Sequence, residues 1–102
     1  MAAINETWLE TLTYARKGIL MLQQAHPREV CLVSALSQLD YLIALERGDE
    51  QDDSLLETID LGYLAMYQLI DILSHELSTT LCDIACKVRR DLRLQGRRSN
   101  LP

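Results

Sequence analysis

The sequence predicts an all-α protein, a single four-helix antiparallel bundle whose helices run up and down in chain order. Leucine is abundant, whereas Phe is absent and Trp occurs once, a composition that favours helix packing over a β-sandwich. Apolar residues recur at steps of three and four in four separate stretches, as they do along one side of a helix. Capping or turn residues separate these stretches, which predicts short connections between neighbouring helices.

The chain of 102 residues is long enough for one domain with one modest core. We expect the bundle to occupy residues 1–94 and residues 95–102 to form a flexible basic tail. No apolar run approaches the length of a membrane span, and no secretory leader is visible at the N-terminus. Three cysteines without framework spacing fit a reducing compartment. These features predict a cytoplasmic protein without membrane contact.

The first helix is expected to begin at Thr7, because residues 7–10 (TWLE) match the capping-box pattern. It should end before Pro27, which lacks the backbone N–H that a continuing helix needs. Its inner stripe would comprise Trp8, Leu12, Ala15, Ile19 and Leu22.

The second helix is expected to have Pro27 in its first turn and to end at Arg47, with Gly48 as a left-handed cap. Its inner positions would be Leu32, Leu36, Leu39 and Ile43. A short acidic loop follows, residues 48–53 (GDEQDD).

A third helix over residues 55–73 is the predicted centre of the bundle, opened by a capping box at residues 54–57 (SLLE). Gly62 lies inside its inner seam and predicts a close approach by a neighbouring helix, because an exposed helical glycine costs up to about 1 kcal/mol relative to alanine. The predicted seam comprises Leu55, Ile59, Gly62, Met66, Leu69 and Leu73.

The fourth helix is expected to begin near Ser74, which can cap it. Its inner stripe would comprise Leu77, Leu81, Ile84 and Val88. One unbroken helix of about 40 residues is the alternative, which typical helix lengths disfavour.

Charge is distributed unevenly along the chain, whose formal net charge is -5. Residues 40–83 hold eleven acids and one base, whereas residues 84–102 hold six bases and one acid. An acidic middle argues against nucleic acid as the main ligand, because phosphate binding needs a basic docking face, and it favours a basic protein partner. The basic end lacks interleaved aromatic residues, so we interpret it as a solvated helix end.

The candidate partner-binding surface is the side of the third helix opposite its seam. Leu64 and Tyr67 would form an apolar centre ringed by acids, as interface centres are commonly built, although a solvated acidic face is the alternative. Acids of the loop would form a rim that steers a basic partner. The predicted partner-binding residues are Tyr41, Asp49, Glu50, Asp52, Asp53, Glu57, Asp60, Tyr63, Leu64, Tyr67 and Asp71.

No set of residues predicts catalysis, a metal or a cofactor. Two histidines in presumed turns offer no nucleophile and base together, and no glycine-rich phosphate loop is present. Asp71, His75 and Glu76 form the only cluster that resembles metal ligands, and no second histidine lies on a neighbouring helix. Cys82 and Cys86 lie one helical turn apart, which is poor disulfide geometry and not a metal-site spacing.

Residues 28–92 resemble the small helical immunity proteins that bacteria keep against type VI secretion toxins. The similar pieces are REVCLVSALSQLDYLIAL before a charged loop, LETIDLGYLAM, HELSTTLCDI at the start of the last helix, and a basic end. The nearest branch protects against an NAD(P)-consuming glycohydrolase toxin. Residues 70–76 (IDILSHE) depart from the family, which has a capped, Pro-containing turn there.

The resemblance implies a cytoplasmic antitoxin for interbacterial competition, without enzymatic activity, that binds a cognate toxin (effector) domain and blocks its nucleotide-binding cleft. The acids would then occupy a basic cleft shaped for nucleotide phosphates. A secretion chaperone or helical adaptor is the alternative, because such proteins are also small, acidic and helical. An enzyme that handles RNA or nucleotides and depends on the basic end and His75 is a third class. The apolar outer positions leave room for a homodimer of the free protein.

Overall fold

The computed structural model describes residues 5–99, with side chains described as far as Leu94. This part of the chain is all-helical, as predicted, and its helices pack in antiparallel order. The elements are α1 (Glu6–Ala25), α2 (Val30–Arg47), a 3₁₀ turn η1 (Ser54–Thr58), α3 (Leu61–Tyr63), a π-helical segment η2 (Leu64–Gln68) and α4 (His75–Ser99). Together α3 and η2 take the place of the predicted third helix.

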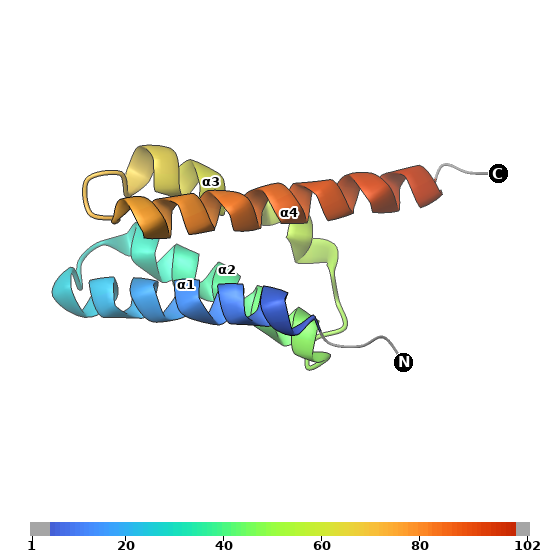
Figure 1. The fold of residues 1–102 in the computed structure, drawn as a ribbon, viewed down its shortest axis with the longest axis horizontal. Coiled ribbons are helices and arrows are strands. Elements are labelled where there is room, and N and C mark those ends of the chain that lie inside the picture. Colours follow the sequence, from blue (N-terminus) through green and yellow to red (C-terminus); the bar gives the residue numbers. More distant parts are fainter. Residues whose placement is uncertain (1–4, 100–102) are drawn as a thin grey trace.

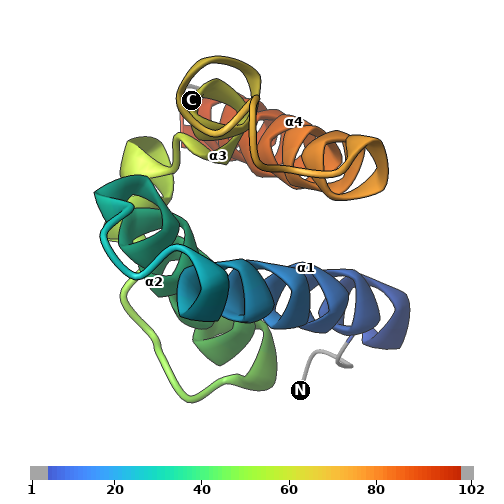
Figure 2. The ribbon, with the colours of Figure 1, turned by 90° about the vertical axis from the view of Figure 1, so that its left-hand side faces the viewer.

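The four helices form two pairs, α1 with α2 and α3 with α4, and α1 also packs against α4 (Figure 1). The end view in Figure 2 shows them around an arc, with α1 and α4 at its two ends. The molecule measures 50 × 25 × 21 Å. Its long axis follows α4, whose 25 residues span about 37 Å at 1.5 Å per residue.

Every helix contributes apolar residues to one shared core, and the described residues place no polar or charged side chain inside it. The predicted inner stripes of the first, second and fourth helices are confirmed, with Trp8, Leu22 and Leu36 half-buried at the edges. The buried residues are Leu12, Ala15, Ile19, Leu32, Ala35, Leu39, Leu42, Ile43, Leu61, Leu64, Ala65, Leu69, Leu77, Leu81, Ile84 and Val88.

The start of α1 differs from the prediction. Asn5, not Thr7, is the N-cap, and its side-chain oxygen accepts the Trp8 N–H at 3.0 Å. Asparagine caps helices at least as well as threonine, so the earlier of two capping residues begins the helix.

The start of α2 also differs, because Pro27 lies in the turn before the helix. Glu29 donates its N–H to the His26 carbonyl, which closes a tight turn around the proline. The Glu29 carboxylate then accepts the Cys31 N–H at 3.3 Å and caps the helix. The second helix therefore begins three residues later than the sequence predicted, at Val30.

Three other predicted helix ends are confirmed. The first helix ends at Ala25, before the proline, and Gly48 caps α2 with a φ of 83° in the left-handed region that favours glycine. The Ser74 hydroxyl accepts the Leu77 N–H at 3.1 Å and caps α4. A chain reversal before α4 excludes one unbroken helix. The last helix, α4, runs to Ser99, whereas the tail was predicted to begin at residue 95. Residues 100–102 of that tail lie outside the described part.

The prediction of one regular helix over residues 55–73 is wrong. The Gln38 side chain of α2 accepts the Asp60 N–H at 3.0 Å and donates to the Asp60 carboxylate at 2.5 Å. This two-bond clamp ties Asp60 to α2, and Ile59 before it is extended, with ψ of 120°. The Leu69 N–H then bonds to the Leu64 carbonyl five residues back, which makes the segment π-helical.

The break changes which side of the third segment is buried. Leu55 and Met66, assigned to the inner seam, are more than half exposed, whereas Leu64, assigned to the outer side, is 5% exposed. The predicted close approach at Gly62 is confirmed, because a Cβ on this glycine would lie 3.3 Å from the Ala85 Cβ of α4.

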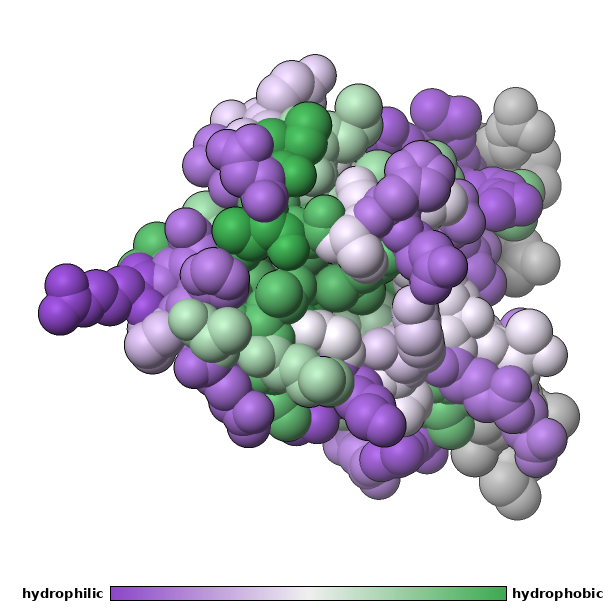
Figure 3. Space-filling view, turned by 60° about the vertical axis from the view of Figure 1, so that its left-hand side comes forward, coloured by the Kyte–Doolittle hydropathy of each residue, from purple (hydrophilic) through white to green (hydrophobic). Residues whose placement is uncertain are grey.

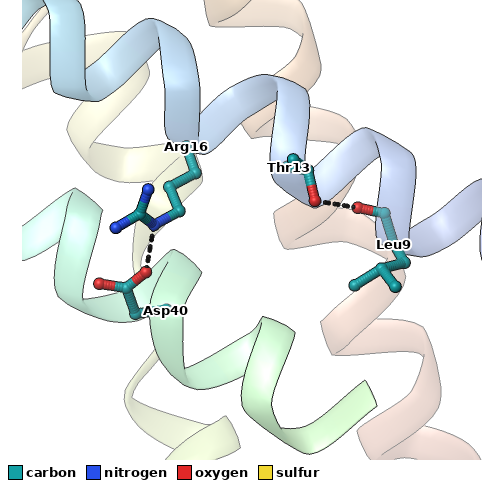
Figure 4. Close-up of polar contacts among 4 residues, drawn as sticks. All are labelled: Leu9, Thr13, Arg16 and Asp40. Atoms are coloured by element: carbon teal, nitrogen blue, oxygen red, sulfur yellow. Dashed lines mark hydrogen bonds and ion pairs between the residues drawn. The ribbon is translucent and has the colours of Figure 1, made fainter. Parts of the chain in front are cut away.

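Polar contacts along α1 are few and lie at the surface. Arg16 of α1 donates to Asp40 of α2 at 2.5 Å, and the Thr13 hydroxyl donates to the Leu9 carbonyl at 2.8 Å (Figure 4). Both partners of the ion pair are substantially exposed, so we expect it to contribute at most about 1 kcal/mol. The stability of the bundle therefore depends on its apolar core.

We predict that Gln38→Ala lowers the free energy of unfolding by about 1–2 kcal/mol, because it removes both bonds of the clamp. Ser37→Ala is the matched control at an exposed neighbouring position and should change stability by less than about 0.5 kcal/mol. Urea unfolding followed by circular dichroism measures both. Equal stability of the two variants would contradict the structural role of the clamp.

Candidate functional site

The eleven predicted partner-binding residues do not form one ridge. Because the third segment is broken, they fall into an acidic loop with Tyr41, a middle group of Glu57 and Asp60, and a last group from Tyr63 to Asp71. In Figure 1 the acidic loop lies toward the right-hand end and the turn before α4 at the left-hand end. Two separate surfaces therefore take the place of the predicted single one.

The acidic loop is held in shape by its own side chains. The half-buried Tyr41 donates its hydroxyl to the Asp52 carbonyl at 2.6 Å, so it anchors the loop to α2. The Glu50 carboxylate accepts the N–H groups of Gln51 and Asp52 at 3.0 and 2.9 Å. Asp52 accepts the Ser54 N–H at 2.9 Å, and this bond lowers the pKa of the Asp52 carboxyl. The exposed carboxylates of Asp49 and Asp53 project from this ordered loop.

The middle group faces the protein itself more than a partner. Glu57 and Arg89 line one small pocket between η1 and α4, so the acidic segment lies against the basic half of α4. The Asp60 carboxylate is engaged by Gln38. Asp60 therefore has a role within the fold, whereas Glu57 is exposed beside the basic half of α4.

An apolar stripe runs along the outer side of α3 and η2 and ends at Ile70, in the turn after η2. Its members are spaced as neighbours on one helix face and are between 54% and 67% exposed. The rings of Tyr63 and Tyr67 lie 5.2 Å apart at 39° to each other. We call it the aromatic stripe, and it comprises Tyr63, Met66, Tyr67 and Ile70.

The aromatic stripe corrects the predicted apolar centre. Tyr63 and Tyr67 are exposed as predicted, but Leu64 points into the core because the break at Asp60 rotates the segment. Met66 was assigned to the core, and Ile70 was not singled out. The other members follow Tyr63 by three, four and seven residues, a spacing that is visible in the sequence. A predicted helix that begins at residue 61 would have placed them on its outer side. Asp71 is exposed just beyond it.

Residues considered for chemistry lie apart. Across the described residues, no three side chains of His, Cys, Asp or Glu gather closely enough to hold a metal ion, and this includes Asp71, His75 and Glu76. Burial raises the pKa of the Cys31 thiol, and the Glu29 carboxylate raises it further. Burial also raises the pKa of Cys82, which disfavours a reactive thiolate.

Comparisons of the chain with protein-family models, curated proteins and solved structures found no match. Within residues 5–99 no helix combines the length and the apolar character that crossing a membrane requires. Functional interpretation therefore starts from the surfaces of this chain, chiefly the aromatic stripe and the acidic loop.

We predict that Tyr41→Phe destabilises the protein by about 1 kcal/mol at neutral pH, because the loop loses the hydroxyl bond to Asp52. Burial raises the pKa of Tyr41 above its usual value of 10.0, and the nearby carboxylates add to this, although a Leu55 backbone bond opposes it. The neutral phenol of Tyr41 therefore makes its full contribution to the free energy of unfolding below pH 10.0. This contribution is lost as the pH rises through the folded-state pKa.

Urea unfolding at several pH values measures this effect. The stability difference between the wild type and Tyr41→Phe should narrow in alkaline solution, while Tyr67→Phe, at an exposed ring, should follow the wild type throughout. A difference that stays constant with pH would contradict the assignment of Tyr41 as the half-buried anchor of the loop.

Proposed function

We propose that this chain is a non-catalytic protein-binding protein, an immunity protein that binds a cognate type VI secretion toxin domain in the bacterial cytoplasm. The observation that carries the protein-binding part is the aromatic stripe, four large side chains more than half exposed on one face. Contiguous apolar surface of this kind on a small folded protein marks interaction sites. The resemblance of residues 28–92 to immunity proteins supports the class of partner.

The composition of the aromatic stripe suits the centre of an interface. Tyrosine supplies a large, stiff contact area with a polar tip, and tyrosines are frequent among residues that dominate binding energy. The Gln68 amide donates to the Tyr63 hydroxyl at 3.3 Å, which helps to fix one ring. Met66 is unbranched and adapts to an irregular partner surface. The stripe would therefore supply most of the affinity.

The acidic loop would supply attraction over a longer range. Its internal hydrogen bonds hold the backbone in place, so little ordering is needed on binding. Asp49 and Asp53 would then approach basic groups that line the toxin's nucleotide-binding cleft and compete with the nucleotide phosphates. Charge complementarity of this kind raises the association rate and depends on salt.

A secretion chaperone or helical adaptor would use the same surfaces in another way. Coexpression with the product of the neighbouring gene separates the two classes. An immunity protein abolishes the toxicity of that product and forms a one-to-one complex with it. A chaperone instead leaves the activity intact and is required for the stability or the export of its client.

We predict that Tyr67→Ala or Ile70→Ala raises the Kd of the one-to-one complex by about tenfold or more, the equivalent of about 1.4 kcal/mol, and weakens protection. Val30→Ala is the control, because Val30 is 75% exposed and lies on α2, outside the stripe. Calorimetric titration and a growth assay measure the two effects. If Val30→Ala reduces binding as much as Tyr67→Ala, the stripe is not the centre of the interface.

Charge reversal tests the acidic loop separately. Asp49→Lys with Asp53→Lys should slow association and reduce its salt dependence, while the helix content stays unchanged. The control compares two single variants of equal net charge, Asp53→Lys in the loop and Asp83→Lys on α4. Asp91 is not used in the control, because it forms an ion pair with Lys87. A loss of binding on substituting Arg89 and Arg90 but not the loop acids would refute the acidic-loop model.

A further inference from the structure

A groove of about 460 Å³ opens between α1 and the start of α4, and none of its lining residues belongs to the aromatic stripe or the acidic loop. Figure 3 shows apolar side chains gathered over this face, between the upper and lower helical pairs. Its volume falls in the range of small-molecule sites, which are mostly apolar with a few placed polar groups. The lining residues are Tyr14, Lys17, Gly18, Met21, Leu22, Ile72, Ser74 and Leu77.

The close approach of α1 and α4 at Gly18 shapes the groove. A Cβ on Gly18 would lie 3.0 Å from a methyl carbon of Leu77, so a side chain there would push the two helices or the leucine aside. Tyr14 and Met21 lie one turn before and after Gly18 and are both more than half exposed. They form apolar walls of the groove on either side of the contact. The unbranched Met21 side chain can change rotamer to fit a bound molecule.

The charge of the groove is opposite to that of the chain. Lys17 is the one charged side chain in the lining, while Asp71 and Glu76 lie outside it. The chain has two lysines, and the other, Lys87, pairs with Asp91 and lies 4.8 Å from the Trp8 ring centroid. Ser74 in the lining caps α4, whose N-terminal end carries a partial positive charge that Glu76 in the first turn partly offsets. A protein of net charge -5 thus combines an apolar groove with two positive features.

We propose that this groove binds a long-chain carboxylate, an anionic amphiphile of the fatty-acid class. The alkyl chain lies against Tyr14, Met21 and Leu22, and the carboxylate lies near Lys17 and the N-terminal end of α4. Charge complementarity favours this occupant over a cationic amphiphile. It also favours it over a second copy, because a two-fold contact through the groove would place two copies of Lys17 close together.

Methionine methyl resonances test the site in the intact protein. The chain has three methionines, of which Met21 lines the groove and Met66 belongs to the aromatic stripe. Dodecanoate, titrated below its critical micelle concentration, should shift the Met21 methyl saturably and leave the Met66 methyl unchanged. Dodecanol should bind more weakly, and dodecyltrimethylammonium should bind least.

Variants of Lys17 test the role of its charge. Lys17→Gln should weaken dodecanoate binding by about threefold to fivefold, the effect of one partly exposed charge pair, whereas Lys17→Arg should retain binding. Lys17→Glu should reverse the preference toward dodecyltrimethylammonium. Circular dichroism checks that each variant keeps its helix content.

Three results would overturn the proposal. Equal shifts of Met21 and Met66 would show non-specific adsorption of the detergent-like probe. Equal affinity for dodecanoate and dodecyltrimethylammonium would show that the groove does not select an anion. A Met21 shift that depends on protein concentration, with a dimer seen by light scattering, would assign the groove to a second copy. None of these results bears on toxin binding, which is tested through other residues.

Discussion

The pair of hydrogen bonds between Gln38 and Asp60 ties the start of the third helical segment to α2. It holds the Asp60 backbone against α2, so the third helical segment begins at Leu61 rather than at the apolar residues before it. The segment is then oriented with Leu61, Leu64, Ala65 and Leu69 toward the core. Its outer side necessarily carries Tyr63 and Tyr67. The polar contact at Asp60 and the burial of these four apolar residues both fit this one orientation of the segment.

The sequence allowed most of the architecture to be predicted, because local signals and tertiary packing agree over α1, α2 and α4. Periodic leucines and terminal caps such as Gly48 and Ser74 act within a few residues and can be recognised without the fold. The third segment differs because its break depends on Gln38, 22 residues away, and a glutamine gives no sign of the residue to which it will bond. The sequence therefore predicts Asp60 as an acid on the outer side of the third helix rather than as a backbone anchor.

Part of the candidate site could be predicted, namely the part whose exposure does not depend on where the third helical segment begins. The acidic loop does not depend on the phase of a helix, and its acids lie where the sequence places them, although Tyr41 proves to be an anchor and not a contact surface. Residues on the third segment do depend on phase. Leu64 is buried and Met66 is exposed, so the apolar centre of the surface contains a methionine and an isoleucine in place of the predicted leucine.

The described core contains only apolar side chains, and this has a consequence for how such a protein diverges. Exchange among aliphatic residues of similar volume usually costs less than about 1.5 kcal/mol, and no buried polar network requires particular partners to be retained. The core can thus accept many combinations of leucine, isoleucine, valine and methionine, while binding partners constrain the residues at the surface. In a lineage built this way, recognisable sequence would be lost long before the arrangement of helices.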